Sequence, residues 1–398
     1  MSSGPLPMPW SLRLRQEAES RRARHGERSI AAAAGIDFCS NDYLGLRSDP
    51  RLAEAARAAA CTHGSGAGAA RLLRGNSPFH DDLEAILAEW KGADSCLLFN
   101  TGYQCNATVI PALAGEGDAV FSDELNHASL VDGCRLARAR GAGIQVYRHL
   151  CLDDLETRLR AWREGAPRGL ALVATDAVFS MDGDAADLGA LLDLCERFEA
   201  LLLVDEAHAT GLLGATGAGL AEAQGLKGRV PLLMGTLGKA LGSFGAFVAC
   251  REDLRAHLVN TCRGFIFSTA LPAPVAAASM EGIRIARSEP WRREASLGFA
   301  GRLRSALGII EGPSAIVPVH IGGNADALRI AGALQARGLD VRAVRPPTVS
   351  EGRARLRITT GAHLQAAAVE TLITALQEVL GSGPVLSESE VQTAARLR

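Results

Sequence analysis

Lys239 is the residue of this sequence that most clearly suggests a chemical role. It is one of three lysines among 42 Lys and Arg residues, and it lies in a segment of small and apolar residues, Met234–Gly245. An amine can lose its proton and attack a carbonyl, whereas a guanidinium stays protonated. Burial among apolar neighbours would lower the pKa of the amine and make it a usable nucleophile. The other lysines, Lys91 and Lys227, lie in polar stretches, and we expect both at the solvated surface.

An aspartate and a histidine follow another apolar segment. Asp205 closes the run 201–205, and His208 comes three residues later. A buried carboxylate is costly without a partner, so Asp205 should face a cation or a donor. The letters Asp-Glu-Ala-His also occur in nucleic-acid-dependent ATPases, which require a Gly-x-x-x-x-Gly-Lys-Ser/Thr phosphate loop. The Gly238-Lys239 pair lacks the rest of that loop, which argues against an ATPase.

Three further segments place glycine or polar residues after apolar runs. Gly102 and Tyr103 lie where a strand passes into a helix, whose first amides can bind a phosphate. His127 and Ser180 follow two other apolar runs. With the amine, carboxylate and imidazole described above, these groups match the needs of pyridoxal 5'-phosphate (PLP). PLP needs a lysine for its Schiff base, an acid for its ring nitrogen, a flat side chain over the ring, donors for its phenolic oxygen and a helix N-terminus for its phosphate.

These residues require a scaffold that brings strand ends together. Seven apolar runs alternate with helical segments and are strand candidates: 96–99, 118–121, 144–147, 170–175, 201–205, 231–234 and 244–249. Strands separated by helices predict an α/β fold with a mainly parallel sheet covered on both faces. In such sheets ligands bind beyond the carboxyl ends of the strands, which is where the candidate residues lie.

The chain is expected to divide into four parts. Residues 1–45 hold a basic amphipathic helix, expected over 11–28, and a short extended stretch, and residues 46–288 form a large α/β domain that binds PLP. The Ser-Glu-Pro at 288–290 marks a boundary, after which 289–384 form a smaller α+β domain and 385–398 a tail. The smaller domain should contain helices near 291–307, 324–337 and 363–380 and strands near 316–321, 340–344 and 354–360.

Composition argues against several other classes of protein. A formal net charge of −2 disfavours binding to nucleic acid or to a membrane surface. No apolar run reaches the roughly 18–20 residues of a membrane span, and the start lacks the apolar core of a signal peptide. Nine cysteines without a Cys-x-x-Cys pair fit reduced thiols and give no pattern for a metal site. We expect a cytoplasmic protein that acts on small molecules.

Nine stretches of the chain carry a family resemblance. They are 40–46 (SNDYLGL), 64–80 (GSGAGAARLLRGNSPFH), 101–106 (TGYQCN), 127–130 (HASL), 178–184 (VFSMDGD), 204–211 (VDEAHATG), 236–242 (TLGKALG), 265–272 (FIFSTALP) and 344–349 (VRPPTV). In this order they resemble the α-oxoamine synthase family of fold-type-I PLP enzymes. The chain departs from the family at Glu206 and Ala209, where Asp and Gly are common, and in its short segment before the first domain.

The resemblance implies a set of cofactor contacts. In chain order these are Gly102 and Tyr103 at the phosphate, His127 stacked on the ring, Ser180 at the phenolic oxygen, Asp205 at the pyridinium nitrogen, His208 at the phenolic oxygen, Thr236 at the phosphate and Lys239 in the Schiff base. Four of them, His127, Asp205, His208 and Lys239, would be catalytic, and Lys239 would also move the α-proton.

The resemblance further implies substrate contacts and an assembly. The implied contacts are Arg345 or Arg357 for an amino-acid carboxylate, Thr348 in the same stretch as Arg345, and Arg21, Arg22 or Arg24 for the acyl substrate. An arginine suits a carboxylate because its planar fork donates two parallel hydrogen bonds. Family members are homodimers with active sites at the subunit interface, so a homodimer is implied here.

The activity implied is a decarboxylative Claisen condensation. The closest branch of the family joins L-alanine to pimeloyl-CoA, or to a pimeloyl-carrier protein, in biotin biosynthesis. Three other branches share the cofactor residues and stay open: 2-amino-3-ketobutyrate CoA ligase, 5-aminolevulinate synthase and serine palmitoyltransferase. A binding protein on this fold that takes no cofactor is a further alternative, which the intact Lys239 disfavours.

Overall fold

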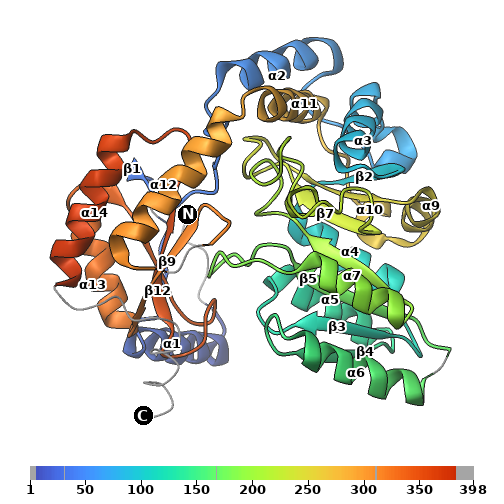
Figure 1. The fold of residues 1–398 in the computed structure, drawn as a ribbon, viewed down its shortest axis with the longest axis horizontal. Helices are drawn as coiled ribbons and strands as arrows, with labels where there is room; N and C mark the ends of the chain where they lie inside the picture. Colours follow the sequence, from blue (N-terminus) through green and yellow to red (C-terminus); the bar gives the residue numbers. More distant parts are fainter. Residues whose placement is uncertain (1–5, 31, 167, 310–311, 382–398) are drawn as a thin grey trace.

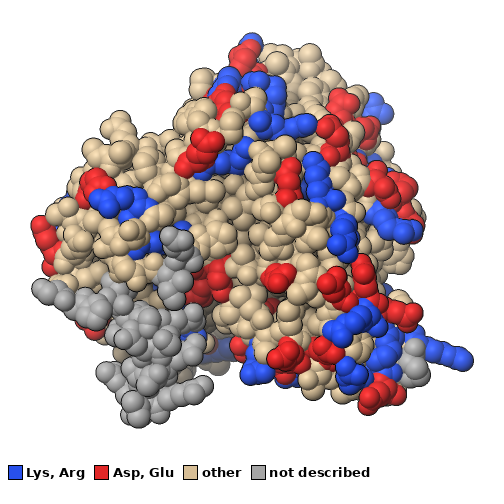
Figure 2. Space-filling view, in the orientation of Figure 1, with Lys and Arg blue, Asp and Glu red and all other residues tan. Residues whose placement is uncertain are grey.

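A seven-stranded sheet and a three-stranded sheet organise the chain, which the computed structural model describes over residues 6–30, 32–166, 168–309 and 312–381. In Figure 1 the larger sheet and its helices lie on the right, and the smaller sheet lies with its helices on the left. The expected tail, 385–398, falls outside the described residues. No helix within these ranges combines the length and apolar character that a membrane span requires. On the face shown in Figure 2, acidic and basic side chains are interspersed over both lobes.

The larger sheet contains the seven predicted strands. They are β2 (Ser95–Phe99), β3 (Ala119–Asp123), β4 (Gly143–Tyr147), β5 (Ala171–Asp176), β6 (Ala200–Asp205), β7 (Leu232–Thr236) and β8 (Ala246–Cys250), in the order β2-β8-β7-β6-β5-β3-β4. Only β8 runs antiparallel to its two neighbours, β2 and β7. The predicted α/β fold with a mainly parallel sheet is therefore confirmed. The carboxyl ends of β3, β5, β6 and β7 meet at one edge, as parallel strands require.

Successive strand residues face two separate cores, because side chains alternate across a sheet. Val120 belongs to the core formed with α4 (Gly102–Leu113) and α5 (Ala128–Ala139). Its neighbour Phe121 belongs to the core formed with α3 (Pro78–Lys91), α6 (Leu152–Gly165) and α7 (Leu188–Arg197). The remaining elements of this lobe are α2 (Pro50–His63), a π-helix (Arg71–Gly75), α8 (Leu220–Ala223), α9 (Glu252–Thr261), α10 (Arg263–Ile266) and α11 (Ala273–Ser288). The sheet is thus covered on both faces.

The smaller sheet is antiparallel and has its own core. Its strands are ordered β11 (Arg342–Val344), β12 (Ala354–Thr359) and β9 (Ile316–Gly322), and its helices are α12 (Trp291–Leu307), α13 (Asn324–Gln335) and α14 (Ala366–Leu380). Leu356 of β12 and Leu372 of α14 are fully buried in this core. The N-terminal segment joins it as well, since β1 (Ile36–Asp37) pairs in parallel with β10 (Leu339–Asp340).

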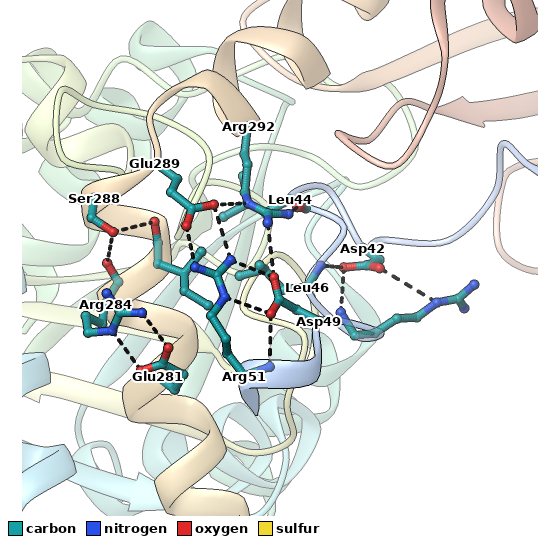
Figure 3. A network of polar contacts seen from close by, with 12 residues as sticks. Asp42, Leu44, Leu46, Asp49, Arg51, Glu281, Arg284, Ser288, Glu289 and Arg292 are labelled. Atoms are coloured by element: carbon teal, nitrogen blue, oxygen red, sulfur yellow. Dashed lines mark hydrogen bonds and ion pairs between the residues drawn. The ribbon is translucent and has the colours of Figure 1, made fainter. Parts of the chain in front are cut away.

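A cluster of ion pairs ties the joint between the lobes to the segment before α2 (Figure 3). The joint lies between the end of α11 and the start of α12. There Arg51 binds Glu289, with Nη1 and Oε1 2.5 Å apart, and Arg292 Nη2 lies 3.0 Å from Asp49 Oδ2. Arg292 also donates through Nη1 to the carbonyl of Leu44, at 2.8 Å. The joint is therefore bonded to the stretch 42–51, which leads from β1 into α2.

The N-terminal helix begins and ends earlier than predicted. The sequence indicated 11–28, whereas α1 covers Met8–Ala23. Pro9 can occupy the first turn, where its missing N–H costs nothing. The backbone of His25 then takes a positive φ of 50°, which ends the helix. No side chain of α1 is buried, and the helix lies below the smaller lobe in Figure 1.

Lys91 is buried, and the prediction that it is solvated was wrong. It is the last residue of α3, its side chain is 1% exposed, and Nζ lies 2.5 Å from Glu206 Oε2. The partner carboxylate stands 115 residues later in the chain, so the local polar composition gave no sign of it. Lys227, by contrast, keeps 39% of its side chain exposed, as expected.

Candidate functional site

Lys239, His208 and Tyr43 form a hydrogen-bonded chain. Lys239 follows β7 and is half-buried, and its Nζ lies 3.0 Å from His208 Nε2. On the other side of the imidazole, Nδ1 lies 2.7 Å from the hydroxyl of Tyr43, which is buried. Tyr43 donates in turn to Asn41 Oδ1 at 3.1 Å. Because the phenol proton is used there, His208 donates from Nδ1 to Tyr43, and its Nε2 lone pair faces Lys239.

Burial changes the protonation of both partners in this chain. It lowers the pKa of Lys239 to about 8, although the charges of Asp205 and Asp176 oppose the change. Burial, and then the charge of Lys239, hold the pKa of His208 well below its usual range. At neutral pH the imidazole is therefore neutral, and about a tenth of the lysine is a free amine, far more than for a lysine of ordinary pKa. A neutral Nε2 can accept a hydrogen bond from the lysine in either of its protonation states.

Asp205 lies at the end of β6, where donors hold both of its oxygens. Asn106 donates to Oδ2 at 2.7 Å, and the backbone N–H of Ala207 donates to Oδ1 at 2.8 Å. Asp176 stands next to it in register at the end of β5. Burial and the neighbouring charge of Asp205 raise the pKa of Asp176 well above its usual range. The two carboxyl groups therefore differ in their surroundings: the pKa of Asp176 is raised, and the oxygens of Asp205 are fixed by donors.

Sequence reasoning singled out neither Asn106 nor Asp176. The sequence nevertheless holds a signal for each of them. Asp176 follows an apolar run, much as Asp205 ends one, and Asn106 is the last residue of the family-like stretch 101–106. The missing signal was their contact with the site, since Asn106 lies 99 residues from its acceptor.

His127 caps the start of α5 beside these carboxylates. Its backbone N–H donates to Asp176 Oδ2 at 2.7 Å, and Nδ1 lies 2.7 Å from Ser129 Oγ. Burial lowers the pKa of His127, and the positive charge of Lys239 adds to this, while Asp205 opposes it. The edge of the ring contacts Tyr103, with centroids 6.4 Å apart at 79°. A neutral, flat ring held at its backbone and at Nδ1 is suited to stacking.

The start of α4 and the end of β7 form an anion cradle. Gly102 and Tyr103 open α4, and the first amides of a helix have no acceptor within it. Thr236 faces this helix end, and its Oγ1 is buried without a hydrogen-bond partner among the described residues. A Cβ on Gly102 would lie 2.8 Å from Thr236 Cγ2, so the close approach requires glycine. Free amides and an unpaired hydroxyl fit the phosphate of PLP.

Arg357 connects the smaller sheet to this chain of residues. It lies on β12 and is buried, with 8% of the residue exposed. Its Nε donates to the carbonyl of Ser180, and its Nη2 donates to Asn41 Oδ1 at 3.0 Å. Asn41 therefore accepts from Tyr43 and from Arg357 at the same oxygen. The positive charge of Arg357 also lowers the pKa of Lys239, so this predicted arginine belongs to the candidate site.

The other predicted substrate residues lie elsewhere. Arg345 donates to the backbone carbonyls of His25 and Glu27. Arg21 lies on the exposed helix α1, with Nη1 3.5 Å from Glu17 Oε2. Thr348 is exposed and accepts at Oγ1 from Arg28 Nη2, at 3.3 Å. Arg28 was not among the residues that sequence reasoning named for the acyl substrate, although it lies in the same arginine-rich segment.

The loop that carries Ser180 is held by both lobes. From the large lobe, His149 bridges two carboxylates, with Nδ1 2.9 Å from Asp123 Oδ1 and Nε2 2.7 Å from Asp184 Oδ2. Burial alone would lower the pKa of His149, but the hydrogen bonds to Asp123 and Asp184 outweigh it and raise the pKa to about 10. From the smaller lobe, Arg355 binds Asp182. These contacts from both lobes hold the loop that carries Ser180 in place.

The sequence is similar to a known protein family and to named enzymes within it. A family model described as aminotransferase class I and II matches residues 33–376. An 8-amino-7-oxononanoate synthase from Anaeromyxobacter dehalogenans is 49% identical over 363 residues, which cover 89% of each chain. A second one, from Alkalilimnicola ehrlichii, is 47% identical over 352 residues, covering 87% of this chain and 88% of the relative.

Solved structures show the same fold. A serine palmitoyltransferase from S. paucimobilis with a bound PLP–myriocin aldimine superposes with a TM-score of 0.85 at 29% identity, covering 94% of this chain and 98% of its own. An 8-amino-7-oxononanoate synthase from Francisella tularensis has a TM-score of 0.73 at 24% identity, covering 87% and 98%. The two lobes, and the strand edge on which the candidate residues lie, therefore belong to an architecture that is known to hold PLP.

Proposed function

Because the chain belongs to the α-oxoamine synthase family of fold-type-I, PLP-dependent enzymes, we propose that it condenses L-alanine with a pimeloyl thioester. The products would be 8-amino-7-oxononanoate, CO2 and the free thiol carrier, and the reaction would serve biotin biosynthesis. The observation that carries the proposal is the amine of Lys239 3.0 Å from a neutral His208. The names of the relatives support the choice of product.

The proposed cofactor contacts follow the geometry of the site. Lys239 would hold PLP covalently, and Asp205, fixed by Asn106, would pair with the ring nitrogen. His127 would cover one face of the ring. When bound, PLP supplies an electron sink for the carbanion formed at the α-carbon of the amino acid. The cradle of α4 amides and Thr236 would hold the phosphate, and Ser180 and His208 would contact the phenolic oxygen.

The protein's own part in proton transfer would rest on Lys239. An amine with a pKa of about 8 can take a proton at neutral pH and return it, which a lysine of ordinary pKa does poorly. His208 would share that proton through Nε2, and Tyr43 would keep the imidazole in the tautomer that leaves Nε2 free to accept. A group whose pKa lies near the operating pH is the most effective acid–base catalyst.

The substrates would be bound by arginines on the smaller lobe and the N-terminal segment. Arg357 is proposed for the carboxylate of alanine, with Arg345 as the alternative. Thr348 and an arginine of the N-terminal segment (Arg21, Arg22, Arg24 or Arg28) are proposed for the acyl chain. We further propose a cytoplasmic homodimer with its active sites at the subunit interface.

The test is a substrate screen on the PLP-loaded enzyme. L-Alanine, glycine and L-serine are each offered with pimeloyl-CoA, acetyl-CoA, succinyl-CoA or palmitoyl-CoA, and free thiol and product mass are measured. We expect alanine with pimeloyl-CoA to react fastest. A faster reaction of serine with palmitoyl-CoA would instead assign the second candidate, which the likeness to serine palmitoyltransferase structures favours. A parallel assay with a pimeloyl-carrier protein identifies the acyl carrier.

Lys239→Ala is the control for the site itself. It should abolish both turnover and the visible absorption band of bound PLP. A variant that kept both would overturn the assignment of Lys239, whatever the substrate.

A further inference from the structure

The second buried lysine of the chain lies behind the candidate site. Lys91 Nζ donates to Glu206 Oε2 at 2.5 Å, to Thr210 Oγ1 at 2.8 Å and to the carbonyl of Ala218. The side chains of Lys91 and Glu206 are 1% and 0% exposed. All three ammonium donors are therefore used, and the ion pair is fully withdrawn from water.

These acceptors bracket one turn of the chain, residues 206–210. Glu206 is its first residue, and its carbonyl accepts from the N–H groups of Ala209 and Thr210, at 2.9 and 2.8 Å. Thr210 is its last residue. Lys91 thus bonds to a side chain at each end of the turn and to Ala218 beyond it. Lys91 therefore links the two ends of the turn 206–210, which is called the braced turn below.

The carboxylate of Glu206 is held equally closely from its other side. Its Oε1 accepts from the N–H of Ala221 at 2.8 Å. Gly219 runs past it with a φ of +126°, and a Cβ there would lie 2.2 Å from Oε2. Only glycine leaves room for the carboxylate at this point. The surrounding chain is therefore shaped around this ion pair.

The braced turn carries the imidazole that faces Lys239. His208 is its middle residue, and Asp205 directly precedes it. The backbone N–H of Glu206 donates to Met234 O on β7, at 2.8 Å, so the turn is also fixed to the strand that leads to Lys239. A displacement of the turn would alter the 3.0 Å contact between His208 and Lys239.

We propose that Lys91 and Glu206 are a positioning pair, which holds the turn 206–210 so that His208 meets Lys239 and Asp205 keeps its orientation. The inference rests on the proposed roles of Lys239 and His208. Neither member of the pair touches the substrate or the reacting atoms. Its contribution is geometric, because a catalytic group displaced by about 1 Å can cost roughly 100-fold in rate.

The test compares Lys91→Met with the double variant Lys91→Met, Glu206→Gln. Lys91→Met leaves a buried carboxylate without its cation, so its thermal unfolding midpoint should fall. The double variant removes both charges, and its midpoint should recover, whereas the brace stays absent. We therefore expect both variants to show a kcat reduced roughly 10- to 100-fold with little change in KM, and a shifted pH midpoint of the visible absorption of bound PLP.

Lys227→Met is the matched control, since it removes the one exposed lysine, and it should leave all of these measurements unchanged. A double variant that regains stability, kcat and the absorption midpoint together would overturn the proposal, because the pair would then serve folding alone. If Lys91→Met does not fold, the double variant decides the matter by the same two readouts.

Lys239→Ala separates this inference from the proposed function. If that variant keeps the visible band, the assignment of Lys239 fails. If it loses the band while the Lys91 variants behave like the parent enzyme, the positioning role alone fails.

Discussion

Lys239 Nζ lies 3.0 Å from His208 Nε2, in a setting that depresses the pKa of both groups. Because the pKa of each nitrogen is lowered, at neutral pH the pair carries at most one excess proton, which the lysine holds. The second ring nitrogen is bonded to the buried hydroxyl of Tyr43, so the orientation of the imidazole is fixed. The contact therefore joins a nucleophilic amine to a neutral acceptor of constant geometry.

Removing this acceptor should reduce catalysis without abolishing it. We expect His208→Asn to lower kcat by roughly 100-fold, the typical contribution of a positioned acid–base group. Tyr43→Phe keeps the imidazole and removes one hydrogen bond, so its loss should be about fivefold, equivalent to about 1 kcal/mol. Steady-state kinetics on PLP-loaded enzyme measure both effects. A His208→Asn variant within twofold of the parent would contradict the role of this contact.

The pKa of Lys239 should be visible in how the apoprotein captures PLP. Only the neutral amine reacts, and its fraction grows as the pH rises through the pKa. With a pKa lowered from 10.5 to about 8, the capture rate should increase from pH 6, reach half its maximum near pH 8 and level off above about pH 9. Stopped-flow absorbance of apoprotein mixed with PLP measures it, with Lys239→Ala as the blank. A rate still rising steeply at pH 10 would show an ordinary lysine.

The bridge at His149 should make the stability of the fold depend on pH. The folded pKa of about 10 exceeds the ordinary value of 6.5, so the stabilisation is complete below about pH 6.5 and is lost as the pH rises towards 10. His149→Gln should lower the free energy of unfolding by roughly 1.5–3 kcal/mol near pH 6, the range for hydrogen bonds to charged groups. Urea denaturation at pH 6, 8 and 10 should show the difference from the parent narrowing with pH. A difference constant over this range would refute the bridge.

The ion pairs at the joint between the lobes should contribute unequally to stability. Arg292 is 12% exposed at its side chain and bonds to Asp49, Glu289 and the carbonyl of Leu44. Arg292→Leu removes these contacts but leaves both carboxylates bound to Arg51, so it should cost roughly 1.5–3 kcal/mol in the free energy of unfolding, the range for hydrogen bonds to charged groups. Arg302→Leu breaks an exposed pair with Glu370 and should cost less than about 1 kcal/mol. Equal costs in chemical denaturation would show that the joint is not held by these ion pairs.

The sequence predicted the large sheet closely because its strands are short apolar runs that end in polar residues. The run 201–205 lies within β6 (Ala200–Asp205), and 244–249 overlaps β8 (Ala246–Cys250). In a parallel sheet the ends of such runs meet at one edge, so Asp205 and His127 could be placed together from their order in the chain alone. In the smaller lobe the expected strand 340–344 is divided between β10 (Leu339–Asp340), which pairs with β1, and β11 (Arg342–Val344), which pairs with β12.

What escaped prediction depends on contacts between distant parts of the chain. Lys91 looked solvated because its neighbours are polar, and its partner Glu206 was noted only as a departure from the family pattern. The contact between Arg28 and Thr348 was not predicted for the same reason, because the two residues are 320 positions apart in the chain. Local composition shows which segments form helices or strands, but not which distant charged residue a buried side chain will contact.

The contacts of Arg357 bear on its proposed role at the carboxylate of the amino acid. Its guanidinium is already bonded to the carbonyl of Ser180 and to Asn41 Oδ1. In that role Arg357 would bind an incoming carboxylate in competition with the carboxamide of Asn41, which also accepts from Tyr43. If Arg357 turns towards the substrate, Asn41 is left to Tyr43 alone, and the phenol that orients His208 gains a less contested acceptor. Binding of the amino acid would in this way change the hydrogen bonding of Lys239, because Asn41 Oδ1 links Arg357 to Tyr43, His208 and the lysine.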